Sequence, residues 1–107
     1  MAEPLFNQRP KLVRPAEETR RLSTLLAEEV LRWPDVKTRK MFGLAAVYRG
    51  EIIFGALPVT RAIESPTAIA YKLVGEKVKG WRLFELSDES GLRAALAVLA
   101  EAYECAG

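Results

Sequence analysis

The hydrophobic residues of this chain change their spacing twice, and this change constrains the fold more than any other feature. Over about residues 16–33 they recur at helical spacing, and Pro34 then ends the pattern. Residues 44–86 hold short apolar runs separated by turns, as β-strands do. Residues 88–104 return to helical spacing. The order predicts an α+β domain: an antiparallel sheet of about four or more strands with an N-terminal and a C-terminal helix.

Four strands are expected between the two helices, at residues 44–48, 51–57, 68–74 and 81–86. The first two flank Arg49-Gly50, a two-residue hairpin connection in which glycine supplies positive φ. Both faces of this hairpin carry apolar side chains. In its second strand, simple alternation separates two sets, Ile52, Phe54 and Ala56 on one face and Ile53, Gly55 and Leu57 on the other.

Such a hairpin needs a cover on both faces, because large exposed apolar patches are uncommon on monomers. If both helices share one side of the sheet, a symmetric homodimer would cover the other. The N-terminal arm is a second candidate cover, through its apolar residues Leu5, Phe6, Leu12 and Val13.

The domain organisation is simple. Residues 1–14 are expected to form an extended arm, since Pro4, Pro10 and Pro15 disfavour helix around them. Residues 15–107 are expected to form one domain, because a chain of 107 residues suits a single core. The single cysteine, Cys105, suits a reducing compartment. Without a leader pattern or an apolar run of about 18 residues, we expect a cytoplasmic protein with no membrane contact.

The residue types argue against common catalytic chemistry. The chain has no histidine and one cysteine, so ordinary zinc sites and Ser-His-Asp or Cys-His nucleophiles cannot be assembled from it. It also lacks the glycine-rich phosphate loops. We therefore predict no catalytic, cofactor-binding or metal-binding residues, and no cofactor. The alternative is an enzyme that uses carboxylates on a small ligand; the acids scattered at turns and strand ends are Glu51, Glu64, Glu76, Glu85 and Asp88.

Basic residues offer a candidate contact surface for nucleic acid or a protein partner. Four of them are expected at one end of the first hairpin: Lys37, Arg39, Lys40 and Arg49. A second group is expected near the later turns: Lys72, Lys77, Lys79 and Arg82. Tyr48 and Tyr71 would add aromatic surfaces, and phosphate contact with base stacking needs both features. The alternative is that these charges only solubilise sheet edges, which is common for lysine.

A short motif carries a family resemblance. The run Arg39-Lys40-Met41-Phe42-Gly43, the following segment 47–55 and Ala70-Tyr71-Lys72 resemble the N-terminal domain of TfoX-type competence regulators, with YjbR-like proteins as fold-level cousins. The resemblance covers roughly residues 15–104 and implies the α+β fold, a bacterial source and a regulatory role in competence or transcription. It implies no catalytic residue.

The motif also has a purely structural interpretation, in which Met41 and Phe42 fill core space and Gly43 permits a bulge or close packing. Taken together, the sequence predicts a small intracellular binding or interaction domain whose ligand it does not identify.

Overall fold

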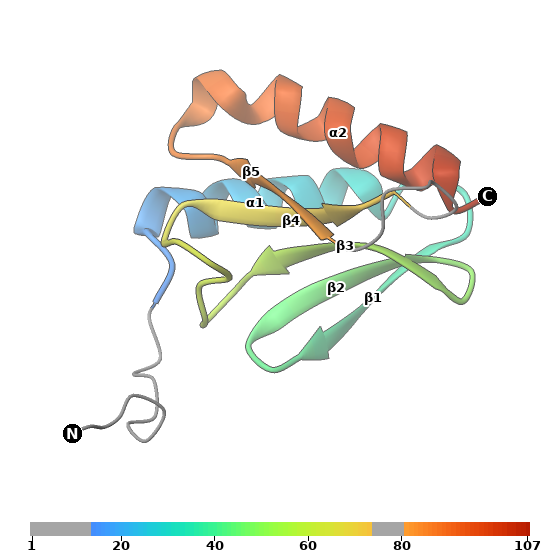
Figure 1. Cartoon of the computed structure of the whole chain (residues 1–107), viewed down its shortest axis with the longest axis horizontal. Helices are drawn as coiled ribbons and strands as arrows, with labels where there is room; N and C mark the ends of the chain where they lie inside the picture. Colours follow the sequence, from blue (N-terminus) through green and yellow to red (C-terminus); the bar gives the residue numbers. More distant parts are fainter. Residues whose placement is uncertain (1–13, 74–80) are drawn as a thin grey trace.

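The computed structural model describes residues 14–73 and 81–107, which form an α+β domain with one five-stranded antiparallel sheet (Figure 1). The strands follow sequence order across the sheet, β1-β2-β3-β4-β5. The elements are α1 (Glu17–Val30), β1 (Val36–Met41), β2 (Leu44–Arg49), β3 (Ile52–Pro58), β4 (Ala68–Lys72), β5 (Trp81–Glu85), a short 3₁₀ helix η1 (Glu89–Gly91) and α2 (Leu92–Cys105). The predicted fold class is confirmed.

Both helices lie on the same face of the sheet, next to each other (Figure 1). The core forms between the helices and that face, and thirteen buried residues join in one cluster there. They are Leu22, Leu26, Val30, Val47, Phe54, Leu57, Ile69, Leu73, Leu86, Ala95, Leu99, Ala102 and Tyr103. Because both helices pack on that one face, the opposite face of the sheet, called the open face below, has no helix over it in the described part of the chain.

Helix α1 begins later and ends earlier than its apolar spacing predicts, at Glu17 and Val30 rather than near residues 16 and 33. Glu17 and Glu18 occupy its first turn, where negative charge is favoured by the helix dipole. The buried Thr19 hydroxyl donates a hydrogen bond of 2.7 Å to the Leu86 carbonyl oxygen, which ties the helix to the end of β5. Ser23 is also buried, and its hydroxyl has no partner among the described residues.

Ser87 and Asp88 precede α2, and the side chain of either residue type could cap a helix N-terminus. Asp88 takes this role: its carboxylate accepts from the Ser90 backbone N–H at 3.0 Å and starts η1. The α-helix itself then runs from Leu92 to Cys105. At its other end the Tyr103 hydroxyl donates 2.8 Å to the Pro34 carbonyl oxygen, which connects α2 to the segment before β1.

Strand β1 was not among the four expected strands, and it changes the interpretation of the Met-Phe-Gly motif. Phe42 and Gly43 have φ angles of 51° and 81° and form the two-residue turn between β1 and β2. Such positive φ values at both positions belong to a type I′ hairpin turn. Phe42 does not fill core space, because its side chain is 79% exposed at the tip of this turn.

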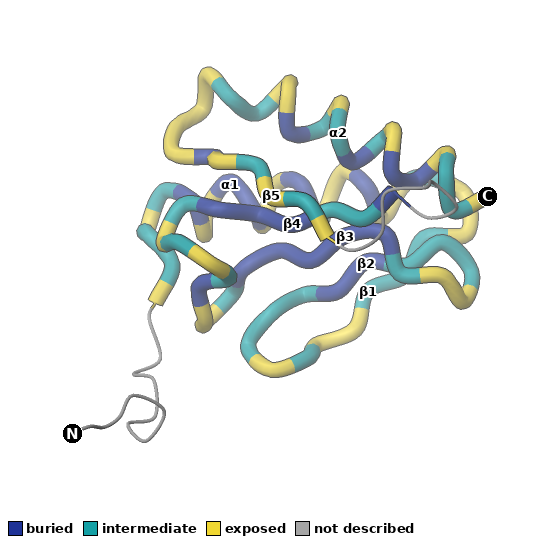
Figure 2. The backbone as a smooth tube through the Cα atoms, in the orientation of Figure 1, coloured by how far each residue is buried: buried dark blue, intermediate teal, exposed yellow. Residues whose placement is uncertain are grey.

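The turn between β2 and β3 is Gly50-Glu51, one residue later than expected, with Gly50 at φ 62°. The pairing of these two strands also shifts between Val47 and Tyr48, which places one extra residue, Phe54, in β3. This bulge breaks the simple alternation predicted for β3, because Phe54 and Gly55 both face the helices. Figure 2 shows that β3 and β4 are the most deeply buried strands.

The predicted N-terminal arm, with Leu5, Phe6, Leu12 and Val13, lies outside the described residues, and so do Lys77 and Lys79. Within residues 14–73 and 81–107, no helix is both long enough and apolar enough to cross a membrane.

Candidate ligand-binding cavity

The strand register identifies which side chains point away from the helices. Val47 and Ile69 belong to the core, so their neighbours in β2 and β4 face the other way. Residues that pair across strands share a face, which extends the assignment to the whole sheet. The open-face positions are Lys37, Arg39 and Met41 in β1, Leu44, Ala46 and Tyr48 in β2, Ile53 and Ala56 in β3, Ala68, Ala70 and Lys72 in β4, and Trp81, Leu83 and Glu85 in β5.

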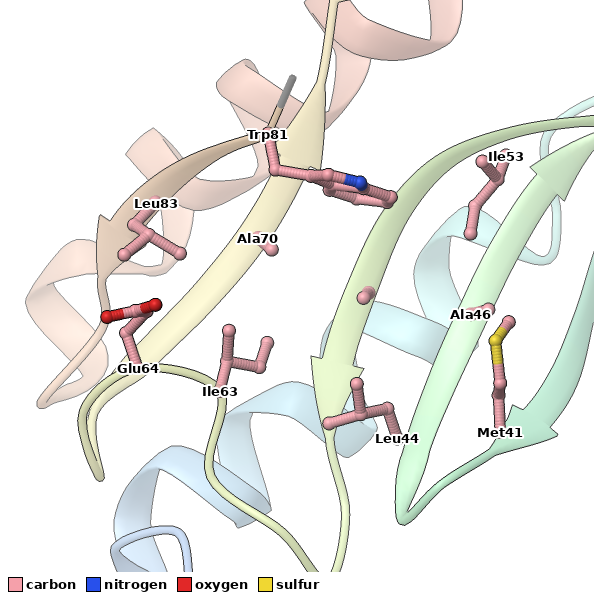
Figure 3. A pocket seen from close by; sticks show the side chains of 10 residues that line it. Met41, Leu44, Ala46, Ile53, Ile63, Glu64, Ala70, Trp81 and Leu83 are labelled. Carbon is pink, nitrogen blue, oxygen red and sulfur yellow. The ribbon is translucent and has the colours of Figure 1, made fainter. Parts of the chain in front are cut away.

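A cavity of about 460 Å³ lies on this open face (Figure 3). Nine of its ten lining residues are apolar, and Glu64 is the one charged residue. The lining residues are Met41, Leu44, Ala46, Ile53, Ala56, Ile63, Glu64, Ala70, Trp81 and Leu83.

The floor of the cavity consists of alanines on three neighbouring strands. Ala46 pairs with Ala56, and Ala56 pairs with Ala70, so the three lie in one row across the middle of the sheet. Larger side chains stand on both sides of this row: Figure 3 shows Trp81 and Ile53 toward one end of the strands and Leu44 toward the other. Small residues flanked by large ones therefore make the hollow.

The loop between β3 and β4 supplies one wall through Ile63 and Glu64. Its position is fixed by Glu85 at the end of β5. The Glu85 carboxylate accepts a hydrogen bond of 3.2 Å from the Ser65 hydroxyl and a short one from the Thr67 hydroxyl. Ala16 adds a backbone bond of 2.8 Å to the Pro66 carbonyl oxygen. These hydrogen bonds fix the position of the loop and so hold Ile63 and Glu64 at the cavity wall.

The two ends of the open face differ in charge. Glu64 and Glu85 lie at the end near the β3–β4 loop. At the other end the Lys72 ammonium lies 5.9 Å from the centre of the Trp81 ring, and Lys37 forms an ion pair of 3.3 Å with Glu51. The cavity therefore has the Glu64 carboxylate on its wall near the β3–β4 loop and the Lys72 ammonium beside Trp81 at the other end, whereas Lys37 is paired with Glu51 and Arg61 of the same loop is exposed near Gly43.

The four basic residues predicted to gather at one end of the first hairpin are divided between the two faces. Lys37 and Arg39 are on the open face, where the Arg39 guanidinium lies 5.5 Å from the Tyr48 ring centre. Lys40 and Arg49 take the opposite orientation. Arg49 lies 4.2 Å from the Tyr103 ring centre and donates 3.0 Å to the Tyr103 carbonyl oxygen, so it supports the end of α2.

Three other sequence expectations are also changed by the geometry. Tyr71 packs against the core side, and Trp81 in place of Tyr71 provides the exposed aromatic surface in this part of the sheet. Arg82 pairs with Tyr71 and shares its orientation, away from the open face. Among the predicted carboxylates, only Glu64 lines the cavity, while Glu76 lies outside the described residues.

The apolar cavity residues were not predicted as a site. Their one signal in the sequence is the double-sided apolar character of the first hairpin, which indicates an uncovered face but not its shape. Within the described residues, no three His, Cys, Asp or Glu side chains are grouped so that they could hold a metal ion. A second, smaller hollow of about 260 Å³ lies between α1 and α2, with Leu25, Leu92 and Leu96 among its lining residues.

Comparisons of the chain with family models, with curated proteins and with solved structures give no match.

Proposed function

We propose that this chain is a small binding domain that holds a mostly apolar ligand in the cavity on its open face. One observation carries the proposal: a cavity of about 460 Å³ in which nine of ten lining residues are apolar. Ligand sites commonly have volumes of about 300–1,000 Å³ and apolar walls with a few polar groups. In accord with its resemblance to the TfoX N-terminal domain, we propose that ligand binding serves regulation in the cytoplasm.

The apolar walls supply the main binding energy. A ligand that buries about 200 Å² of apolar surface there gains roughly 5 kcal/mol, at about 25 cal/mol per Å². Lost translational and rotational freedom cancels part of this gain, so a ligand of this size binds with a free energy no better than about −4 kcal/mol, which is a dissociation constant in the millimolar range.

Substitution of the floor tests this proposal. Ala70 is 4% exposed and its side chain faces the cavity, so Ala70→Met places a longer side chain inside it. Ala97→Met on the exposed side of α2 is the matched control. With naphthylmethanol as a neutral ligand, followed by nuclear magnetic resonance (NMR), we expect binding to weaken at least about tenfold in Ala70→Met only, or about 1.4 kcal/mol.

Ala46→Met, from the same floor, repeats the test if Ala70→Met does not fold by circular dichroism. Equal binding by the wild type and a folded floor variant would overturn the proposal, as would no binding by the wild type.

A second copy of the chain is the rival occupant, since the expected homodimer would need the same face. Two copies of this face packed against each other would enclose a void, because a hollow of about 460 Å³ lies over the alanine row. Stable interfaces are packed at their centre about as densely as protein interiors. The hollow therefore favours the small ligand. The exposed Phe42, in the turn between the lining residues Met41 and Leu44, is the feature that favours the homodimer.

Weak nucleic-acid binding is a second candidate function. It is favoured by two cation–aromatic pairs on the open face, Arg39 with Tyr48 and Lys72 with Trp81. Such pairs suit phosphate contact beside stacked bases. Fluorescence anisotropy with single-stranded DNA tests it: Arg39→Ala should weaken binding and Lys40→Ala, on the opposite face, should not. Equal losses would indicate unspecific charge attraction, and no binding by the wild type would exclude this candidate.

A further inference from the structure

We propose that the ligand is an amphipathic amine whose apolar body covers the alanine floor and whose ammonium group pairs with Glu64. This inference rests on the proposed function, because it identifies the ligand class for the same cavity. It follows from where the polar groups lie along the cavity wall and from the charges beyond its two ends.

Two of the lining residues carry a polar group, a carboxylate in Glu64 and an indole N–H in Trp81. Among the hydrogen bonds and ion pairs of residues 14–73 and 81–107, none involves the Glu64 carboxylate. Figure 3 shows this carboxylate beside Leu83, away from the Trp81 ring. A carboxylate at the wall of an apolar cavity favours a ligand with a cationic group at one end of an apolar body.

A second carboxylate strengthens the acidic end. Glu85 lies on the open face at the end of β5 and accepts hydrogen bonds from the hydroxyls of Ser65 and Thr67. These bonds hold the loop that carries Glu64, so Glu85 acts as a positioning residue. Its negative charge also adds to the attraction for an ammonium group at this end.

The charges at the other end orient the ligand. The Lys72 ammonium lies 5.9 Å from the Trp81 ring centre, and repulsion from it disfavours a second ammonium there. Arg39 adds positive charge at the β1 edge, where it lies over Tyr48. An amine therefore binds with its charge toward Glu64 and its apolar body toward Trp81. A carboxylate ligand would bind in the reverse sense, so the test must include one.

Three ligands that share a naphthyl group and differ in charge distinguish the contribution of charge to binding from that of apolar contact. They are naphthylmethylamine, naphthylmethanol and naphthylacetate. Glu64 is exposed, so the charge contribution is modest, and we expect the amine to bind about two- to fivefold more tightly than the alcohol. The acetate should bind most weakly. In about 1 M salt, where the Debye length is about 3 Å, the preference should largely vanish.

Substitutions at Glu64 assign the preference to this residue. Glu64→Gln should make the amine and the alcohol bind equally, and Glu64→Lys should reverse the order of amine and acetate. Glu101→Gln, an exposed acid on α2, is the matched control and should change nothing. Dissociation constants come from NMR titrations of the full chain.

The outcomes distinguish the two proposals. If none of the three ligands binds, the proposed function fails. If all three bind with equal affinity, if the acetate binds most tightly, or if Glu64→Gln leaves the amine preference intact, the cavity still binds ligands but the assignment of an amine is overturned.

Discussion

The two faces of the sheet carry similar residue types but differ in how far their side chains are exposed to solvent. On the helix-covered face Phe54, Leu57 and Ile69 are at most 1% exposed. On the open face Trp81 and Leu83 are 43% and 44% exposed. The difference comes from the helices, which both pack on one side, and not from the hydrophobicity of the strands. An apolar strand face therefore becomes core or binding surface according to what covers it.

The largest expected effect compares one leucine on each face. Leu57→Ala should cost about 2–5 kcal/mol of unfolding free energy, because it leaves a hole in the packed core. Leu83→Ala should cost less than about 1 kcal/mol, because nearly half of that side chain already contacts water. Urea denaturation measures both. Equal losses would show that the open face is packed like the core, contrary to the account.

The next comparison adds atoms instead of removing them. A Cβ at Gly55 would lie 2.8 Å from Val47 Cγ2 and 3.0 Å from Leu99 Cδ2, so Gly55→Ala overfills the core and should cost about 1–3 kcal/mol. The neighbouring Ala56→Val adds methyl groups on the cavity side, where space exists, and should cost less. Thermal unfolding of the two variants provides the test, and a larger loss for Ala56→Val would contradict it.

A smaller effect, of opposite sign, is expected at the hairpin tip beside the cavity. Phe42 has a φ of 51°, which costs a residue with a Cβ roughly 1 kcal/mol, and its exposed ring gains little packing in return. Asparagine tolerates this conformation in type I′ turns. Phe42→Asn should therefore raise the unfolding free energy by about 0.5–1 kcal/mol by urea denaturation.

The same variant separates the two occupants proposed for the open face. If a ligand is the occupant, Phe42→Asn keeps the monomer mass in light scattering and still binds naphthylmethanol. A wild-type dimer that this substitution dissociates would favour the second copy.

The smallest effect belongs to the exposed surface of the helix layer. Hydrogen bonds from Arg21 lower the pKa of Glu18 below its ordinary value of 4.5. A carboxyl group whose pKa is lowered by folding stabilises the fold above its unfolded pKa, and this contribution is lost as the pH falls through the folded value. Glu18→Gln should slightly flatten the decline in stability as the pH falls below about 4.5 toward the lower folded-state pKa of Glu18, and Glu104→Gln should not. If Glu104→Gln changed the pH dependence of stability more than Glu18→Gln did, the pH dependence could not be assigned to Glu18.

The helices and four of the five strands could be predicted, because apolar residues recur at helical spacing in the helices and form short runs between turn residues in these strands. Strand β1 could not, since Lys37, Arg39 and Lys40 interrupt its apolar pattern, as lysines and arginines often do on edge strands. The motif at Met41 and Phe42 was misassigned to the core because a type I′ turn usually contains asparagine or glycine, and phenylalanine gives no turn signal.

The cavity could be predicted only in part. Apolar residues on both faces of the first hairpin indicated that one face would need a cover. The alanine row depends on the pairing of Ala46, Ala56 and Ala70, which the bulge at Phe54 sets and which the sequence does not reveal. The position of Glu64 at the cavity wall likewise depends on how the β3–β4 loop folds back over the sheet. Hydrogen bonds from Ser65 and Thr67 to Glu85 set this position, and only the three-dimensional structure shows them.

The central claim is that a ligand binds in the cavity on the open face, and the most direct test is to locate the protein groups that a bound ligand contacts. Intermolecular nuclear Overhauser effects between naphthylmethylamine and the protein methyl groups report this contact. The account predicts signals to the methyls of Ala46, Ala56 and Ala70 on the cavity floor. Signals instead to Leu92 and Leu96, in the smaller hollow between α1 and α2, would contradict it and move the binding site to the helix layer.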